Sequence, residues 1–150
     1  MQFVSRHLGI ALLGLAVVAG GCKKKEPPPA PPVVVQPAPP PPVAVAGIQL
    51  GKAIGADKAV TAATMTFGVK DTIYASIGTT GVASAATLSA KWTFQTGQVV
   101  DTSSVAIAPT GPATTEFHIT KKSAWPVGKY KVAIMLNGMP AGEQEFEVKK

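Results

Sequence analysis

The chain has 150 residues, of which 46% are hydrophobic and 15% charged, and its formal net charge is +6 at neutral pH. This length allows one ordinary domain. Much of the apolar and basic excess lies near the N-terminus, where Arg6, the only arginine, is found. The remainder is mildly basic and has no arginine cluster, which argues against a nucleic-acid surface. We therefore expect no nucleic acid among the partners.

The first 21 residues have the organisation of a bacterial export signal. A short segment with Arg6 precedes twelve apolar residues, 8–19, and Gly20 and Gly21 follow. A membrane-spanning helix needs about 20 apolar residues, and this run stops before the lysines at 23–25. We therefore expect residues 1–21 to be a cleaved signal peptide.

The four residues that end this segment resemble the lipobox of bacterial lipoproteins, with Ala19 in place of the usual leucine and Cys22 at the end. The resemblance implies that Cys22 becomes the first mature residue and carries diacylglyceryl and N-acyl (palmitate) groups. Two or more acyl chains give durable anchoring, and Cys22 is the only cysteine, so it has no internal disulfide partner. Because Lys23 follows, and not the aspartate typical of inner-membrane retention, we expect the outer membrane.

Residues 22–42 read as a tether. Ten of the sixteen residues from 27 to 42 are proline, which fixes φ, lacks an amide donor and favours extended polyproline II chain. At about 3.1 Å per residue, this stretch reaches about 50 Å. The sequence therefore predicts a stiff spacer between the membrane and a domain at 43–150.

From residue 43 onward, apolar and polar residues alternate with the two-residue period of strands. The clearest strands lie near residues 73–77, 88–95, 115–120, 130–136 and 145–149, with weaker candidates near 47–50, 59–67 and 99–107. Turn residues separate them, notably Thr96-Gly97, the loop at 109–112 and Asn137-Gly138. Helical periodicity is absent from this part of the sequence.

About seven short strands without a helix predict an all-β fold, an immunoglobulin-like antiparallel β-sandwich, with an eight-stranded barrel as the rival. Residues 125–130 resemble the loop before the tyrosine corner of immunoglobulin-like and fibronectin-like domains. The resemblance implies that the Tyr130 hydroxyl bonds to the backbone upstream and that Trp92 fills the centre of the core.

The mature sequence offers little material for catalysis, because His118 is its only imidazole and its carboxylates are scattered. His118 alternates with apolar residues, which places it on the solvent side of its strand. Asp71 and Asp101 lie near strand ends, where aspartate caps turns. Glu143, Glu145 and Glu147 share one face of the last strand and can pair with the lysines at 129 and 131. We expect no catalytic residue, metal site or cofactor.

These features favour a lipid-anchored, non-catalytic envelope protein whose domain binds another envelope protein through edge strands and loops. One alternative is a module that binds cell-wall polysaccharide or another glycan, for which Trp125 and Tyr74 would be solvent-exposed contact residues. The other alternative is an envelope enzyme, which would gather Asp71, Glu116 or His118 in one pocket.

Overall fold

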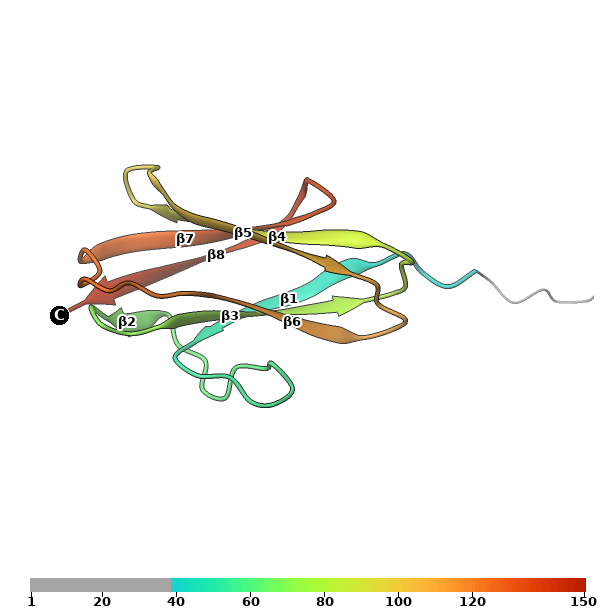
Figure 1. Cartoon of the computed structure of the whole chain (residues 1–150), viewed down its shortest axis with the longest axis horizontal. Coiled ribbons are helices and arrows are strands. Elements are labelled where there is room, and N and C mark those ends of the chain that lie inside the picture. The colour runs from blue at the N-terminus through green and yellow to red at the C-terminus, as the bar shows by residue number, and fades with distance from the viewer. Residues whose placement is uncertain (1–38) are drawn as a thin grey trace, which may run out of the picture. The chain divides into compact units, whose positions relative to one another are not determined.

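A computed structural model describes residues 39–150; the predicted signal peptide, Cys22 and the predicted tether up to residue 38 lie outside the described residues. Eight strands and no helix form the described part (Figure 1). The strands are β1 (Ala44–Gly51), β2 (Thr66–Gly68), β3 (Ile73–Thr80), β4 (Ala86–Phe94), β5 (Val99–Ile107), β6 (Ala113–Ile119), β7 (Gly128–Leu136) and β8 (Met139–Lys149). No helix in residues 39–150 is long and apolar enough to cross a membrane.

The strands form two sheets that pack face to face (Figure 1). One sheet has the order β1-β3-β6 and the other the order β2-β8-β7-β4-β5. All pairs are antiparallel except the short pairing of β2 with β8. The chain changes sheet repeatedly, as in immunoglobulin-like sandwiches. The predicted fold class is therefore confirmed, and the three-residue β2 accounts for the eighth strand.

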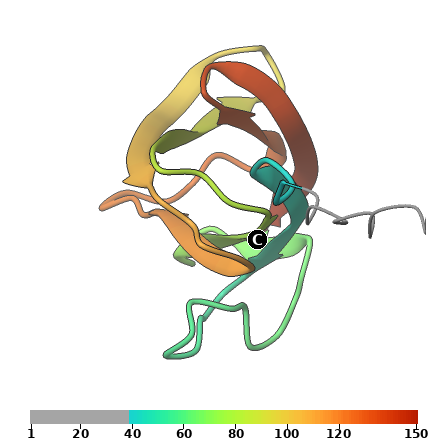
Figure 2. The same cartoon turned by 90° about the vertical axis from the view of Figure 1, so that its right-hand side faces the viewer.

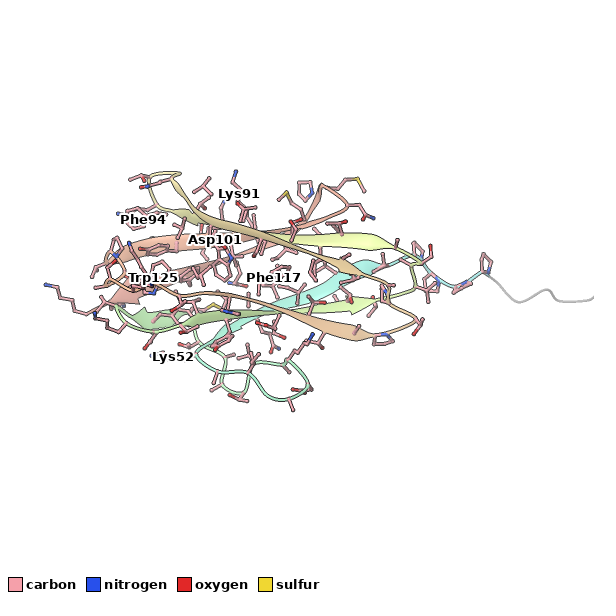
Figure 3. The ribbon with its side chains drawn as sticks, viewed as in Figure 1. Lys52, Lys91, Phe94, Asp101, Phe117 and Trp125 are labelled. Atoms are coloured by element: carbon pink, nitrogen blue, oxygen red, sulfur yellow. The ribbon has the colours of Figure 1, made fainter. Side chains whose placement is uncertain are left out.

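The alternation seen in the sequence places one face of each central strand in the core. Trp92 is fully buried, as expected, and its ring meets that of Phe146 edge-on with the centroids 5.9 Å apart. Figure 3 shows Phe117 between the two sheets and Lys91 on the outer side of the larger sheet. Fully burying one such apolar side chain contributes about 1.5–3 kcal/mol, so this interior is the main source of stability.

The tyrosine corner is confirmed. The Tyr130 hydroxyl donates a 2.8 Å hydrogen bond to the carbonyl oxygen of Pro126, four residues upstream. Burial raises the pKa of this hydroxyl, which keeps it protonated as a donor. The bond fastens the loop before β7 to the beginning of that strand.

Two of the predicted turns are also confirmed. Asn137 and Gly138 connect β7 to β8 with φ values of 52° and 79°, the backbone that a two-residue hairpin of this hand requires. The Asn137 side chain accepts a 2.8 Å hydrogen bond from the Thr87 amide in β4. Gly97, with φ of 83°, turns the chain between β4 and β5.

The weak strand candidate at 59–67 is wrong for most of its length, because only Thr66–Gly68 form a strand. The segment before it is an irregular loop that folds back on the end of β1. The amides of Thr61 and Thr64 donate to the carbonyls of Ala53 and Leu50. These hydrogen bonds pair backbone groups of the loop without forming a β-ladder. The apolar residues of this segment do not predict them.

The two long sides of the sandwich differ (Figure 2). On one side β1 packs beside β8, with the Ile48 side chain against Gly142. On the other side β5 pairs only with β4, and β6 pairs only with β3, so within residues 39–150 both edges are free. The larger sheet has five strands and the smaller has three, which leaves the inner face of β5 partly uncovered. The sandwich is therefore closed on the side of β1 and β8 and open on the side of β5 and β6, which we call the free side.

The last two prolines of the predicted tether are held by the domain. The Val82 amide donates a 3.0 Å hydrogen bond to the Pro41 carbonyl, and Pro42 bridges to Val82. Gly81 has φ of 84°, and a β-carbon there would lie 2.2 Å from the Pro42 carbonyl oxygen. The chain thus enters the domain at a fixed place, beside the loop that connects β3 to β4.

Candidate binding pocket

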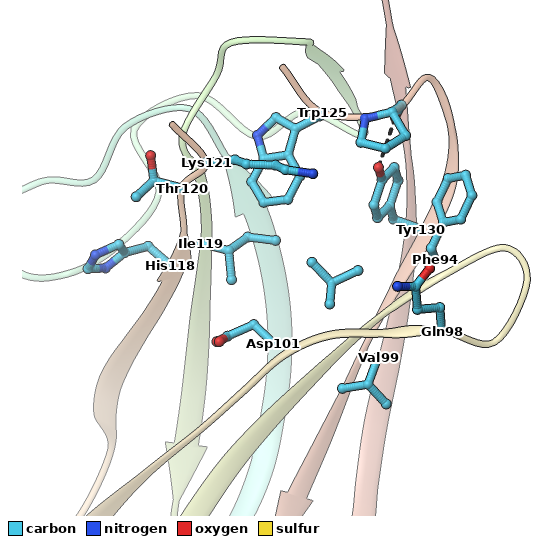
Figure 4. A pocket seen from close by; sticks show the side chains of 12 residues that line it. Phe94, Gln98, Val99, Asp101, His118, Ile119, Thr120, Lys121, Trp125 and Tyr130 are labelled. Atoms are coloured by element: carbon cyan, nitrogen blue, oxygen red, sulfur yellow. Dashed lines mark hydrogen bonds between the residues drawn. The ribbon is translucent and has the colours of Figure 1, made fainter. Parts of the chain in front are cut away.

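A pocket of about 460 Å³ opens on the free side of the sandwich. Its walls are the first residues of β5, the end of β6 and the loop that leads to β7 (Figure 4). Ile119, Val100 and Tyr130 supply apolar surface, while Asp101 and Lys121 supply opposite charges at the rim. A concave site with an apolar floor and a few polar groups is the usual form of a binding site.

Trp125 is part of this pocket and is only 5% exposed, so the expectation of a solvent-exposed contact residue is wrong. Its indole nitrogen donates a 2.9 Å hydrogen bond to the Asp71 carbonyl, and its amide donates to the Val69 carbonyl. Its ring meets Tyr130 edge-on, and the Lys121 ammonium lies 5.8 Å from the ring centroid. Trp125 therefore locks the loop to the segment between β2 and β3.

Asp71, whose carbonyl accepts the bond from the Trp125 indole, is itself held in place through its side chain. Its carboxylate accepts a hydrogen bond from the Lys52 ammonium at 2.8 Å and from the Gly68 amide at 2.7 Å. The Lys52 bond, followed by the Gly68 bond, holds the pKa of Asp71 below its ordinary value. Asp71 thus caps a turn, as predicted, whereas Asp101 lies inside β5 because that strand begins at Val99.

His118 lies on the solvent side of β6, as predicted, and contributes to the pocket rim. Its Nδ1 atom is 3.2 Å from a carboxylate oxygen of Glu116, and its ring centroid is 5.4 Å from that of Tyr74. Tyr74 is half-buried on the outer face of the smaller sheet and does not line the pocket. Tyr74 and Trp125 therefore do not form one aromatic platform.

The ionisable groups of the enzyme alternative are not gathered in this pocket. Asp71 is paired with Lys52, and Glu116 with His118; of Asp71, Glu116 and His118, only His118 lines the pocket. No group of three or more histidine, cysteine or acidic side chains in residues 39–150 could hold a metal ion.

The predicted charge pairing between the last two strands is confirmed. Lys129 lies opposite Glu147 and Lys131 opposite Glu145 in the β7–β8 ladder. The Lys131 ammonium is 3.1 Å from a Glu143 carboxylate oxygen, on the diagonal. Glu147 forms its ion pair at 3.0 Å with Lys149 of its own strand. The acidic run of β8 is therefore surface charge of small energetic weight.

The pocket as a unit, which includes Lys121, Thr120 and Gln98, is not predicted by any pattern in the sequence. The sequence predicts Asp101 only as a turn residue. The one signal available was an aspartate among small and apolar residues in the weak strand candidate at 99–107.

No family model matches the sequence, and no curated protein matches it. Among solved structures, the fold is similar to an immunoglobulin-like protein from Pseudomonas aeruginosa, with a TM-score of 0.47, 15% identity and coverage of 71% of this chain and 96% of that one. An alkylpurine DNA glycosylase from Pseudomonas fluorescens, in complex with DNA, gives a TM-score of 0.48 and 15% identity over 72% of this chain and 30% of that one. A β-glucosidase from Listeria innocua gives 0.46 and 10% identity over 69% of this chain and 16% of that one. The chain thus spans less than a third of the length of these two enzymes.

Proposed function

We propose that this is a lipid-anchored protein of the bacterial cell envelope whose immunoglobulin-like domain is a non-catalytic binding module for another envelope protein. The anchor is Cys22, in the outer membrane, and the predicted tether at 22–42 is the arm, whose last two prolines contact the domain. The pocket on the free side of the sandwich is the proposed binding site.

The observation that carries this proposal is the separation of the pocket from the place where the arm enters. Pro41 and Pro42 are held beside Val82, just before β4 begins. The pocket lies where β4 ends, at Phe94. Nine residues of strand separate these ends, about 30 Å at 3.3 Å per residue. An anchored domain therefore keeps its pocket clear of its own tether.

The chemistry of the pocket favours a protein ligand. Its floor is apolar, its rim has both charge signs, and the adjoining edges of β5 and β6 have unpaired backbone groups. Extended polypeptide satisfies all of these groups at once, through main-chain hydrogen bonds and alternate side chains. A glycan platform would need exposed aromatic faces, and Trp125 is buried.

The anchor is tested by labelling cells with an alkyne analogue of palmitate. We expect the wild-type chain to take up the label and to sediment with outer membranes, and Cys22→Ser to lose both properties. A mature chain whose mass shows an unmodified Cys22 would exclude the anchor.

The binding site is tested in cells with a photo-crosslinking amino acid at Val99, on the pocket rim, and at Thr87, which is exposed on the outer face. We expect one dominant protein to be crosslinked from Val99 and not from Thr87. Crosslinks that appear only with cell-wall fragments would favour the polysaccharide alternative, and equal products from both positions would contradict a specific site.

A further inference from the structure

The charged residues of the domain are unevenly distributed along its long axis. The chain enters where β3 finishes and β4 begins, and β8 finishes at the opposite end (Figure 1). The segments from which the entry half is built have no charged residue; they are 39–51, 72–90, 102–115 and 132–142. The charges of the described residues therefore lie between the middle of the sandwich and its far end, or in the loop that follows β1.

Five lysines gather at the far end, which we call the basic end: Lys70 before β3, Lys121 and Lys122 after β6, Lys129 at the beginning of β7, and Lys150 after β8. The register places these positions together. In the smaller sheet Ile73 pairs with Ile119, where β3 begins and β6 ends. In the larger sheet Gly128 pairs with Val148, where β7 begins and β8 ends. The loop between β6 and β7 is hydrogen-bonded to the segment between β2 and β3, which joins the two groups.

The positive charge of this end is not balanced by nearby carboxylates. All five lysines are exposed, and none has an ion pair within residues 39–150. The two carboxylates at this end already have partners, since Asp71 binds Lys52 at 2.8 Å and Glu147 binds Lys149 at 3.0 Å. The described residues contain ten lysines and seven carboxylates, a net charge of +3. An excess of five at the basic end therefore leaves the rest of the domain slightly negative.

We propose that the basic end binds an anionic cell-wall polymer, one with carboxylates or phosphates repeated along its chain. A lysine ammonium is a point charge on a flexible stem, with three donors that can turn towards different anions. Residues 39–150 contain no arginine, the residue whose planar fork suits a single carboxylate or phosphate in fixed geometry. Five separate ammonium groups therefore suit spaced, mobile anions better than one anion in a fixed site.

The place of the arm favours the wall over a membrane surface, a step that rests on the proposed anchor at Cys22. The arm of about 50 Å enters at the uncharged end, and the strands add about 30 Å. The basic end is thus presented up to about 80 Å from the anchoring membrane. A segment that enters lipid usually has tryptophan, phenylalanine or leucine on its apolar face. Here Trp125 is buried and only Val127 is exposed in the loop between Lys122 and Lys129.

The basic end is a contact separate from the pocket. Of its five lysines only Lys121 lines the pocket. Binding at the basic end depends on long-range attraction, which salt screens, whereas the pocket offers an apolar floor and sheet edges. Both sites can be occupied at once, so an anchored chain would hold its protein partner beside the wall.

The test uses the full chain in neutral phosphatidylcholine vesicles, which float, mixed with isolated cell-wall sacculi, which sediment. We expect the vesicles to sediment with the sacculi at about 0.1 M salt, where charges are screened over about 10 Å, and to float at about 1 M salt, where the distance is about 3 Å. Exchanging Lys70→Gln, Lys122→Gln and Lys129→Gln together should reduce the sedimented chain at least about tenfold, the order given by three exposed charge pairs.

The matched control removes the same amount of charge elsewhere, with Lys58→Gln, Lys91→Gln and Lys131→Gln together. It should reduce the sedimented chain less than about twofold, because surface pairs away from the contact contribute little. Equal losses from the two triple variants would show that net charge and not the basic end determines binding, and would overturn the proposal. Wild-type vesicles that float in the presence of sacculi at low salt would overturn it as well.

Vesicles of phosphatidylglycerol, in place of sacculi and at the same concentration of negative charge, are the second probe. Clustering with them that exceeds binding to sacculi would assign the basic end to a membrane and reject the polymer. The crosslink from Val99 reports the pocket independently, and it should survive exchange of Lys70, Lys122 and Lys129, which do not line it. Chains that float with vesicles and crosslink from Val99, but do not bind sacculi, reject the basic end and leave the proposed function intact. A chain that does not float with the vesicles but sediments with sacculi rejects the anchor alone.

Discussion

At the scale of single residues, Tyr130 shows how one hydroxyl holds the pocket in shape. Tyr130→Phe removes its hydrogen bond to the Pro126 carbonyl and keeps the buried ring. We expect the free energy of unfolding to fall by about 1 kcal/mol, the net contribution of one such bond. Urea denaturation measures this value, with an unchanged m-value. Tyr74→Phe is the matched control and should change stability by less than about 0.5 kcal/mol, since surface changes are usually small.

Asp71 makes stability depend on pH on the acid side. Its pKa is lower in the folded chain than in the unfolded chain, so its contribution is present above the unfolded pKa and is lost as pH falls through the folded pKa. Asp71→Asn should therefore reduce stability at pH 7, by about 1 kcal/mol for a partly exposed pair.

The cost of Asp71→Asn should shrink as the pH is lowered below about 4, the ordinary pKa of aspartate. Urea denaturation of wild type and variant at several pH values measures the difference. A difference that stays constant down to pH 2 would mean that the carboxylate charge does not contribute.

Gly81 is a third residue whose role follows from geometry. Gly81→Ala would place a β-carbon 2.2 Å from the Pro42 carbonyl oxygen, at a φ of 84°. Gly138→Ala has a similar φ of 79° but nothing within 4 Å of the added atom. The second change should cost about 1 kcal/mol for backbone strain alone. The first should cost at least about 1 kcal/mol more, because the clash adds to this strain. Thermal unfolding of the two variants, compared side by side, measures the excess.

At the scale of elements, the turn between β7 and β8 is fastened to a third strand. Asn137→Ala loses both the hydrogen bond from the Thr87 amide and the tolerance of asparagine for a positive φ. We expect a loss of about 1.5–2 kcal/mol in chemical denaturation. Asn137→Gly keeps the backbone freedom and loses only the bond, so it should cost about half as much. Equal costs would mean that the side-chain bond accounts for the whole effect.

The elements also show what the sequence could predict. The alternation of apolar and polar residues predicts the long strands, because a strand with one buried face has an apolar residue at every second position. The tyrosine corner was predictable because its bond spans only four residues. Trp125 was not, since its burial depends on a carbonyl at position 71, 54 residues away.

The binding pocket could not be predicted from the sequence either, because it also depends on residues that are far apart in the chain. The pocket forms because a five-stranded sheet packs on a three-stranded one. No local sequence pattern predicts how many strands each sheet will have. Asp101, Lys121 and Thr120 come together only after β5 and β6 have been placed on opposite sheets. Sequence patterns report the burial of individual strands, whereas this pocket is a property of their assembly.

At the scale of the whole molecule, the proposed function requires that the arm carry the pocket away from the membrane. Deleting residues 27–38 removes about 37 Å of polyproline II chain at 3.1 Å per residue. It leaves Pro41 and Pro42, which contact the domain, in place. We expect the domain to unfold at the same temperature and to stay membrane-bound. The crosslink from Val99 to its partner should fall to background.

Two replacements of residues 27–38 distinguish the effect of the arm's length from the effect of its composition. A Pro-Ala repeat keeps an extended chain and should restore the crosslink. A Gly-Ser repeat has a root-mean-square span of only about 19 Å, because flexible chains grow as the square root of their length, and should restore it weakly. If the deletion leaves the crosslink intact, the partner lies close to the anchoring membrane, and the arm has a purpose other than distance.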